Sequence, residues 1–152
     1  MIKIVCVGKI KESFLEDGIK EYQKRMEAWQ KIQIIEVKET NTFSIERNIE
    51  EEGQKLLQKI AKDDWVITLE ILGKNLTSND FAKTINDLYT YGKTNLTFVI
   101  GGSNGLSDEV KRRGDLRLSF STFTFPHQLM RLILMEQIYR AFTIINNKEY
   151  HK

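Results

Sequence analysis

The sequence predicts a single α/β domain, over residues 1–152, in which helices flank a mostly parallel β-sheet. Its 152 residues are the length of one ordinary domain. Short apolar runs alternate with segments of helical periodicity, and this alternation favours parallel strands because each of them needs a crossover connection. A hydrophobic fraction of 41% with 29% charged residues is typical of a soluble globular protein.

The predicted strands and helices follow one another in regular alternation. Strands are predicted at residues 2–7, 32–37, 65–71, 96–100 and 116–120, where β-branched and other apolar residues run together. Helices are predicted at residues 12–29, 44–61, 78–91, 107–113 and 126–145, where apolar residues recur at helical spacing. Gly73 is expected to close the third strand.

Start signals support several of these helices. Ser13, or the turn before it, can begin the first helix. Ser78 or Asn79 can cap the third helix, and Ser107 can cap the fourth. Pro126 is the only proline in the chain and is tolerated in the first turn of the last helix.

The last helix carries apolar residues on two sides. One side holds Met130, Leu134, Ile138 and Ala141, and the other holds Leu129, Leu132, Ile133 and Tyr139. Because such a helix is usually buried on both sides, we expect one side on the sheet and the other on a second subunit. Arg131 lies in an apolar stripe and needs a partner or a ligand. Glu136 and Arg140 have the spacing of a structural ion pair.

The fourth strand ends abruptly at Gly101, Gly102 and Gly105. Glycine lets a backbone approach a ligand closely or adopt positive φ, so this loop is either a ligand cradle or a tight turn. Its spacing fits neither the GxGxxG dinucleotide motif nor the GxxxxGK[ST] phosphate loop, and the chain holds no GxSxG or HExxH. The chain therefore lacks the sequence motifs that usually indicate Rossmann dinucleotide binding or ATP hydrolysis.

Three loops follow the third, fourth and fifth strands, at residues 69–76, 101–106 and 120–125. Because parallel strands end at one edge of a sheet, these loops can form one pocket. The third loop alternates hydroxyl groups with aromatic rings, which suits an adenine-like ring. The alternative is a strand that continues through this loop, with Thr124 capping the last helix.

Cysteine, histidine and charge patterns exclude several classes of protein. Cys6, His127 and His151 are scattered without metal-ligand spacing, so we expect no metal site. No apolar run approaches the roughly 20 residues of a membrane span. A lone cysteine and an opening run too short for a signal peptide favour the cytoplasm. The segment of residues 107–152 has an excess of Lys and Arg over Asp and Glu. It either contacts phosphate or forms an ordinary surface of mixed charge.

Several motifs, taken together, are similar to those of one family. They are Phe98-Val99-Ile100-Gly101-Gly102-Ser103-Asn104-Gly105-Leu106, Leu118-Ser119-Phe120-Ser121, Phe125-Pro126-His127-Gln128, Glu136-Gln137-Ile138-Tyr139-Arg140-Ala141 and Tyr150-His151-Lys152. With the first and third strands, the similarity covers the whole chain. The chain resembles the ribosomal RNA large subunit methyltransferase H family, small SPOUT-class enzymes that consist of the catalytic domain alone.

The resemblance implies a single-domain SPOUT fold with a C-terminal trefoil knot. It also implies a homodimer with S-adenosyl-L-methionine as cofactor, and no metal or membrane. The implied reaction is methylation of N3 of a pseudouridine in 23S ribosomal RNA, within the large subunit or the ribosome. Two subunits are expected to contribute to each active site.

The resemblance also implies roles for particular residues. The implied cofactor contacts are Leu69, Gly101, Gly102, Gly105, Phe120, Ser121, Thr122, Phe123, Thr124 and Phe125. His127 and His151 are candidates for handling the N3 proton, and Arg131 for orienting the base or a phosphate. The candidates for holding RNA are Tyr139, Arg140, Tyr150 and Lys152. Alternatively, His127 is a helix-cap histidine and the last three residues are a tail of no consequence.

Two other functions remain open at this point. The chain can be a SPOUT enzyme for transfer RNA or for another ribosomal position. It can also be a noncatalytic, flavodoxin-like module that docks on the ribosome through its basic end.

Overall fold

The computed structural model describes residues 1–152 and contains one five-stranded sheet. The strands are β1 Ile2–Val7, β2 Ile32–Val37, β3 Trp65–Asn75, β4 Leu96–Ile100 and β5 Leu116–Ser119. The helices are α1 Ser13–Met26, α2 Ile45–Leu57, α3 Ser78–Thr90, α4 Asp108–Arg113 and α5 His127–Ile145. The strand order is β2-β1-β4-β3-β5, and every neighbouring pair is parallel. The predicted α/β fold is confirmed, and the implied trefoil knot stays a prediction.

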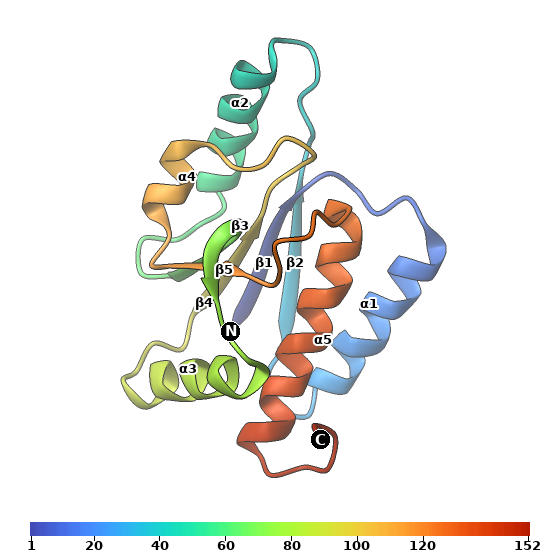
Figure 1. Ribbon diagram of the computed structural model, residues 1–152, viewed down its shortest axis with the longest axis vertical. Helices are drawn as coiled ribbons and strands as arrows, with labels where there is room; N and C mark the ends of the chain where they lie inside the picture. The colour runs from blue at the N-terminus through green and yellow to red at the C-terminus, as the bar shows by residue number, and fades with distance from the viewer.

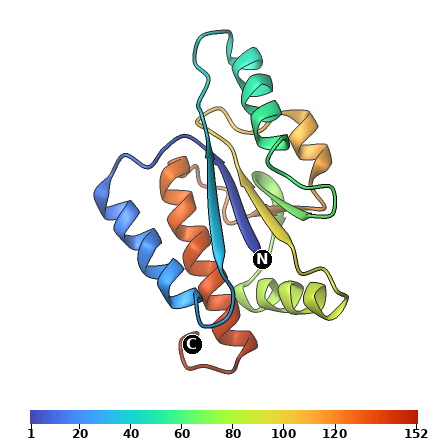
Figure 2. The ribbon, with the colours of Figure 1, turned by 180° about the vertical axis from the view of Figure 1, so that it is seen from behind.

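Helices cover both faces of the sheet and form three layers (Figures 1 and 2). The larger core lies between the sheet and α1, α3 and α5, and the smaller core lies under α2 and α4. Alternate residues of β1 serve the two cores, since Ile4 and Cys6 belong to the larger and Val5 and Val7 to the smaller. Burial on both faces explains why β1 and β4 read as nearly continuous apolar runs.

Strand β3 continues beyond Gly73, where the sequence predicted its end. Both Leu69 and Lys74 pair with Leu118 of β5, so the residues between them bulge out of the ladder. A Cβ atom on Gly73 would lie 2.8 Å from the Leu118 carbonyl carbon and 2.9 Å from that of Arg117. Gly73 is therefore required for a close crossing over β5 rather than for a strand end.

The start of α3 also differs from the prediction. Thr77, rather than Ser78 or Asn79, is the N-cap, and its hydroxyl accepts a hydrogen bond from the Asp80 N–H at 3.0 Å. The Ser78 hydroxyl instead donates to the side chain of Gln137 in α5 at 2.8 Å. Three capping residues stand in a row here, and the contact with α5 decides which of them caps.

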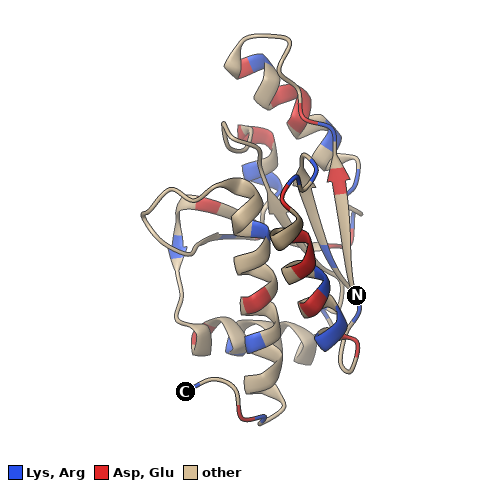
Figure 3. Cartoon of the chain, turned by 90° about the vertical axis from the view of Figure 1, so that its right-hand side faces the viewer, with Lys and Arg blue, Asp and Glu red and all other residues tan.

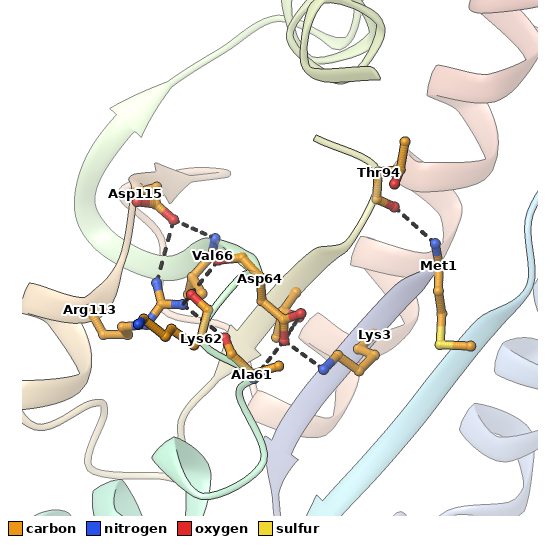
Figure 4. A network of polar contacts seen from close by, with 10 residues as sticks. Met1, Lys3, Ala61, Lys62, Asp64, Val66, Thr94, Arg113 and Asp115 are labelled. Carbon is orange, nitrogen blue, oxygen red and sulfur yellow. Dashed lines mark hydrogen bonds and ion pairs between the residues drawn. The ribbon is translucent and has the colours of Figure 1, made fainter. Parts of the chain in front are cut away.

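Polar side chains close the amino edge of the sheet (Figure 4). The buried Asp64 carboxylate contacts the Lys3 ammonium at 2.6 Å and accepts from the Thr97 hydroxyl at 2.9 Å. The Arg113 guanidinium donates to the carbonyl oxygens of Ala61, Lys62 and Asp64. These polar groups form hydrogen bonds and ion pairs with one another, so their role at this edge is structural. A ligand site is therefore expected at the carboxyl edge.

Candidate active site

The loops that follow β3, β4 and β5 meet in one cleft at the carboxyl edge of the sheet. The cleft has a volume of about 460 Å³. Ten residues that the sequence singled out line it: Leu69, Gly101, Gly102, Gly105, Phe120, Ser121, Phe123, Thr124, Phe125 and His127. Thr122 lies outside this lining. A cleft of this size accommodates a small organic molecule.

The glycine loop, residues 101–106, has no room for a side chain where its two halves meet. A Cβ atom on Gly101 would lie 2.7 Å from the carbonyl carbon and oxygen of Gly105. The Gly105 N–H donates to the Gly102 carbonyl at 3.1 Å, and Gly105 has a φ of +87°. The glycines thus make a tight turn, and the same turn leaves bare backbone along the cleft wall.

The aromatic loop, residues 120–125, is held by its own serines. The Ser119 hydroxyl donates to the Ser121 carbonyl at 3.1 Å, and the Ser121 hydroxyl accepts from the Phe123 N–H at 3.0 Å. Strand β5 ends at Ser119, and the N-cap position of α5 is Pro126, without a side-chain cap bond. Thr124 therefore does not cap α5, and the alternative of a continuing strand is wrong.

His127 is the first residue of α5 and lines the cleft. Burial lowers the pKa of its imidazole; the Glu39 carboxylate opposes this shift, while the Arg131 guanidinium adds to it. A lowered pKa keeps the ring neutral near pH 7, so that one ring nitrogen can accept a proton. The geometry is compatible with the predicted role in proton handling.

Arg131 is a buried residue of α5, next to the lining residue Met130, and is not itself part of the cleft lining. Its side chain is only 1% exposed, and its guanidinium contacts the Glu36 carboxylate at 2.6 Å and donates to the Gly8 carbonyl at 3.0 Å. The partner that an arginine in an apolar stripe requires is therefore Glu36, at the end of β2. In one protomer these contacts attach the start of α5 to β1 and β2, and a role for Arg131 in orienting the base stays a prediction.

The end of the chain packs on α5 and forms a tail cluster of Tyr139, Arg140, Tyr150 and His151. The Tyr139 and Tyr150 rings meet edge to face with centroids 4.8 Å apart. The Arg140 guanidinium lies 4.8 Å from the Tyr150 ring centroid and contacts the His151 Nδ1 at 3.1 Å. Six of the predicted catalytic and RNA-binding residues do not line the cleft. Four of these six form the tail cluster, and a fifth, Lys152, is exposed.

Comparisons with known proteins bear directly on this cleft. A family model described as "Predicted SPOUT methyltransferase" matches residues 1–151. The ribosomal RNA large subunit methyltransferase H of Limosilactobacillus fermentum is 51% identical, and that of Carboxydothermus hydrogenoformans is 50% identical, each over 99% of both chains. The chain belongs to the ribosomal RNA large subunit methyltransferase H family, within the SPOUT methyltransferases.

A solved structure supports the fold of this SPOUT family member. A "probable methylase family protein" from Haemophilus influenzae Rd KW20 superposes with a TM-score of 0.56 at 14% identity, covering 99% of this chain and 70% of that chain. At this identity the likeness shows a shared fold alone. No helix of this SPOUT chain is both long and apolar enough to cross a bilayer.

In this SPOUT chain the cleft lining includes His127 and Met130 in the first turns of α5. The end of the chain packs on Tyr139 and Arg140 in the second half of α5, toward the end of the helix where Figure 1 shows the C-terminus. The helix has 19 residues and is about 28 Å long. Figure 3 shows α5 mostly tan, since Arg131, Glu136 and Arg140 are its only charged Lys, Arg, Asp or Glu residues. Within one protomer, nine residues of α5, about 14 Å, separate the lining residue Met130 from Tyr139 of the tail cluster.

Glu52 of α2 is a residue near the cleft that sequence reasoning missed. Its side chain is buried, and its Oε2 accepts from the Thr40 N–H at 2.9 Å. Its Oε1 lies 3.3 Å from the position of a Cβ atom on Gly102, so it supports the glycine loop from behind. The acidic run of residues 50–52 concealed it, because the sequence does not show which of three glutamates is buried.

Glu52→Gln is expected to stabilise the fold at pH 7 and not at acidic pH. Burial raises the pKa of the Glu52 carboxyl above 4.5, and the Glu39 carboxylate adds to this. The folded state therefore favours the protonated carboxyl group. The free energy of unfolding contains this contribution in full below the ordinary pKa of a glutamate and loses it as the pH rises through the raised pKa. Glutamine keeps the acceptor for Thr40 without the charge, so thermal unfolding should show a gain at pH 7 that vanishes near pH 4.

The exposed Glu50 on the same helix provides the control. Glu50→Gln should change the unfolding temperature by less than Glu52→Gln at either pH. A stability loss for Glu52→Gln at pH 7 would show that the charge itself is stabilising and would contradict the prediction.

Proposed function

We propose that this chain is an S-adenosyl-L-methionine-dependent methyltransferase that methylates N3 of a pseudouridine in 23S ribosomal RNA. It acts as a homodimer in the cytoplasm. The observation that carries the proposal is the convergence of three loops in one cleft, in a chain 50% identical over 99% of its length to a protein named ribosomal RNA large subunit methyltransferase H.

The cleft suits a molecule with an aromatic ring and polar groups. The Phe120 and Phe125 rings supply flat apolar walls, and the glycine loop supplies backbone that no side chain covers. The proposed cofactor contacts are Leu69, Gly101, Gly102, Gly105 and residues 120–125. When bound, S-adenosyl-L-methionine supplies a methyl group on a reactive sulfonium.

The chain's own residues have two tasks in this reaction. They align the uracil N3 with the methyl group, which converts an encounter into a step within one complex. They also assist loss of the weakly acidic N3 proton. His127 lies in the cleft with a lowered pKa and is the proposed acceptor of that proton. Arg131 positions the start of α5, and thereby His127, through its contacts with Glu36 and Gly8.

The homodimer is proposed to form through the outer side of α5. Leu129 and Ile133 lie there only half-buried, and Leu132 on the neighbouring side packs against Gly18 of α1. Two α5 helices packed antiparallel by a twofold axis would bring the tail cluster of one protomer to the cleft of its partner. This arrangement places Tyr139, Arg140, Tyr150, His151 and Lys152 beside the bound RNA.

Mass spectrometry of 23S ribosomal RNA tests the reaction. The RNA of a strain lacking the gene should lose one methylpseudouridine, and a plasmid copy should restore it. An intact modification in the deletion strain would overturn the proposal. Calorimetry with S-adenosyl-L-methionine tests the noncatalytic alternative, because a docking module would give no heat of binding. An enzyme for another RNA position would bind the cofactor but would not methylate this pseudouridine.

Mixing two inactive variants tests the shared active site. One variant is Gly101→Ala, with a damaged cleft, and the other lacks residues 150–152. A heterodimer of the two has one site with an intact cleft and an intact partner tail, so mixed subunits should recover about one quarter of wild-type methylation. Each variant remixed with itself is the control. No recovery in a mixture proven to contain heterodimers would show that each site belongs to one protomer.

A further inference from the structure

The contact between Arg140 and His151 fixes where the His151 ring carries its proton. The Arg140 Nη1 lies 3.1 Å from the His151 Nδ1. A guanidinium has donors only and does not lose a proton in proteins. The Nδ1 must therefore be the acceptor, and an imidazole that accepts at Nδ1 is neutral and carries its hydrogen on Nε2.

Other groups hold the guanidinium in this orientation. Its Nε donates to the Glu136 Oε1 at 3.0 Å, and the Tyr150 hydroxyl donates to the same oxygen at 3.1 Å. The guanidinium also lies over the Tyr150 ring. Glu136 thus occupies one side of Arg140 and leaves Nη1 for His151. The charged and titratable groups that face Arg140 are Glu136, Tyr150 and His151, and the Tyr139 ring that Tyr150 meets also contacts Tyr22 and Arg25 of α1.

We propose that Arg140 holds His151 as a neutral Nε2–H donor, and that His151 stabilises one uracil carbonyl oxygen during methyl transfer instead of removing the N3 proton. This inference rests on the proposed function and on the tail reaching the partner's cleft. As the N3–H bond breaks, its electron pair forms the N3–methyl bond, the sulfur keeps the electrons of its bond to the methyl group, and the proton passes to another acceptor. Negative charge develops on the two carbonyl oxygens beside N3, and the His151 Nε2–H would stabilise it by donating to one of them.

Nitrogen NMR of the intact protein, labelled in its two histidines, tests the protonation state without any reaction. His151 should show an unprotonated Nδ1 and a protonated Nε2 near pH 7, and Arg140→Met should remove this preference. His127→Asn gives the assignment of the two histidines. A proton on Nδ1, or on both nitrogens, overturns the inference even if the protein methylates RNA as proposed.

Three substitutions at His151 test the role in catalysis, in single-turnover methylation at saturating cofactor. Glutamine places its amide N–H near the Nε2 position and should retain activity within about tenfold of wild type. Leucine offers no donor and should lose about 100-fold to 1,000-fold, as for other single oxyanion donors. Asparagine places its amide near Nδ1, facing Arg140, and should behave like leucine.

The pH profile separates a donor from a base. If His151 were the catalytic base, His151→Gln would be as inactive as His151→Leu. The acidic limb of the rate profile, which is the fall in rate at acidic pH, would also be lost in every His151 variant. That result would overturn the inference. The donor role predicts an acidic limb that His151→Gln leaves in place. If the wild-type protein methylates no ribosomal RNA, the proposed function fails by itself, and the NMR result still decides the ring's protonation state.

Discussion

Gly101→Ala is expected to weaken S-adenosyl-L-methionine binding by about 100-fold or more, equivalent to about 2.7 kcal/mol. The added Cβ atom would lie 2.7 Å from the carbonyl carbon and oxygen of Gly105. Those atoms belong to backbone, so the glycine loop must open to admit the methyl group. Because the loop forms one wall of the cleft, the loss should appear in the dissociation constant measured by calorimetry.

Gly92→Ala is the matched control for this substitution. Gly92 lies after α3, has a φ of +81° and would have no atom within 4 Å of an added Cβ. The control should lose some stability through backbone strain and keep wild-type cofactor affinity. Circular dichroism of both variants shows whether the fold is retained. Wild-type affinity in a folded Gly101→Ala variant would contradict a cofactor site at the glycine loop.

Removing residues 150–152 is expected to lower ribosomal RNA methylation by about 1,000-fold while changing cofactor affinity by less than about threefold. The deletion takes away the Tyr150 ring and His151, which supply base stacking and an N–H donor in the proposed site. In the same protomer the end of the chain packs on Tyr139 and Arg140, whereas the cleft lining reaches α5 only at His127 and Met130, about 14 Å or more along the helix from Tyr139. Single-turnover methylation and calorimetry, performed on one preparation, measure the two quantities.

Tyr150→Phe separates catalysis from anchoring. It keeps the ring on Tyr139 and removes only the hydroxyl that donates to Glu136. It should reduce methylation far less than the deletion. Tyr91→Ala, which removes an exposed ring after α3, should change neither quantity. Equal losses of methylation and cofactor binding on tail deletion would indicate a purely structural tail.

Local sequence patterns predicted where most elements lie, because apolar periodicity depends on neighbours along the chain. The bounds of β1, β2 and β4 agree with the prediction, while α1 ends at Met26 and α2 at Leu57, earlier than expected. Periodicity cannot locate these ends. A helix ends where its tertiary contacts no longer offset the conformational entropy lost by ordering another turn. The same limit applies to the cap of α3, where the contact of Ser78 with α5 leaves Thr77 as the cap.

The sequence by itself determined the parallel α/β fold, the three loops at one sheet edge and, through its motifs, the family. The tertiary structure decided three other matters: that Gly73 serves a crossing over β5, that Arg131 pairs with Glu36, and that the tail cluster lies on the second half of α5, apart from its own cleft. The physical reason is sequence separation. Arg131 and Glu36 are 95 residues apart, and only the strand order β2-β1-β4-β3-β5 brings such positions together.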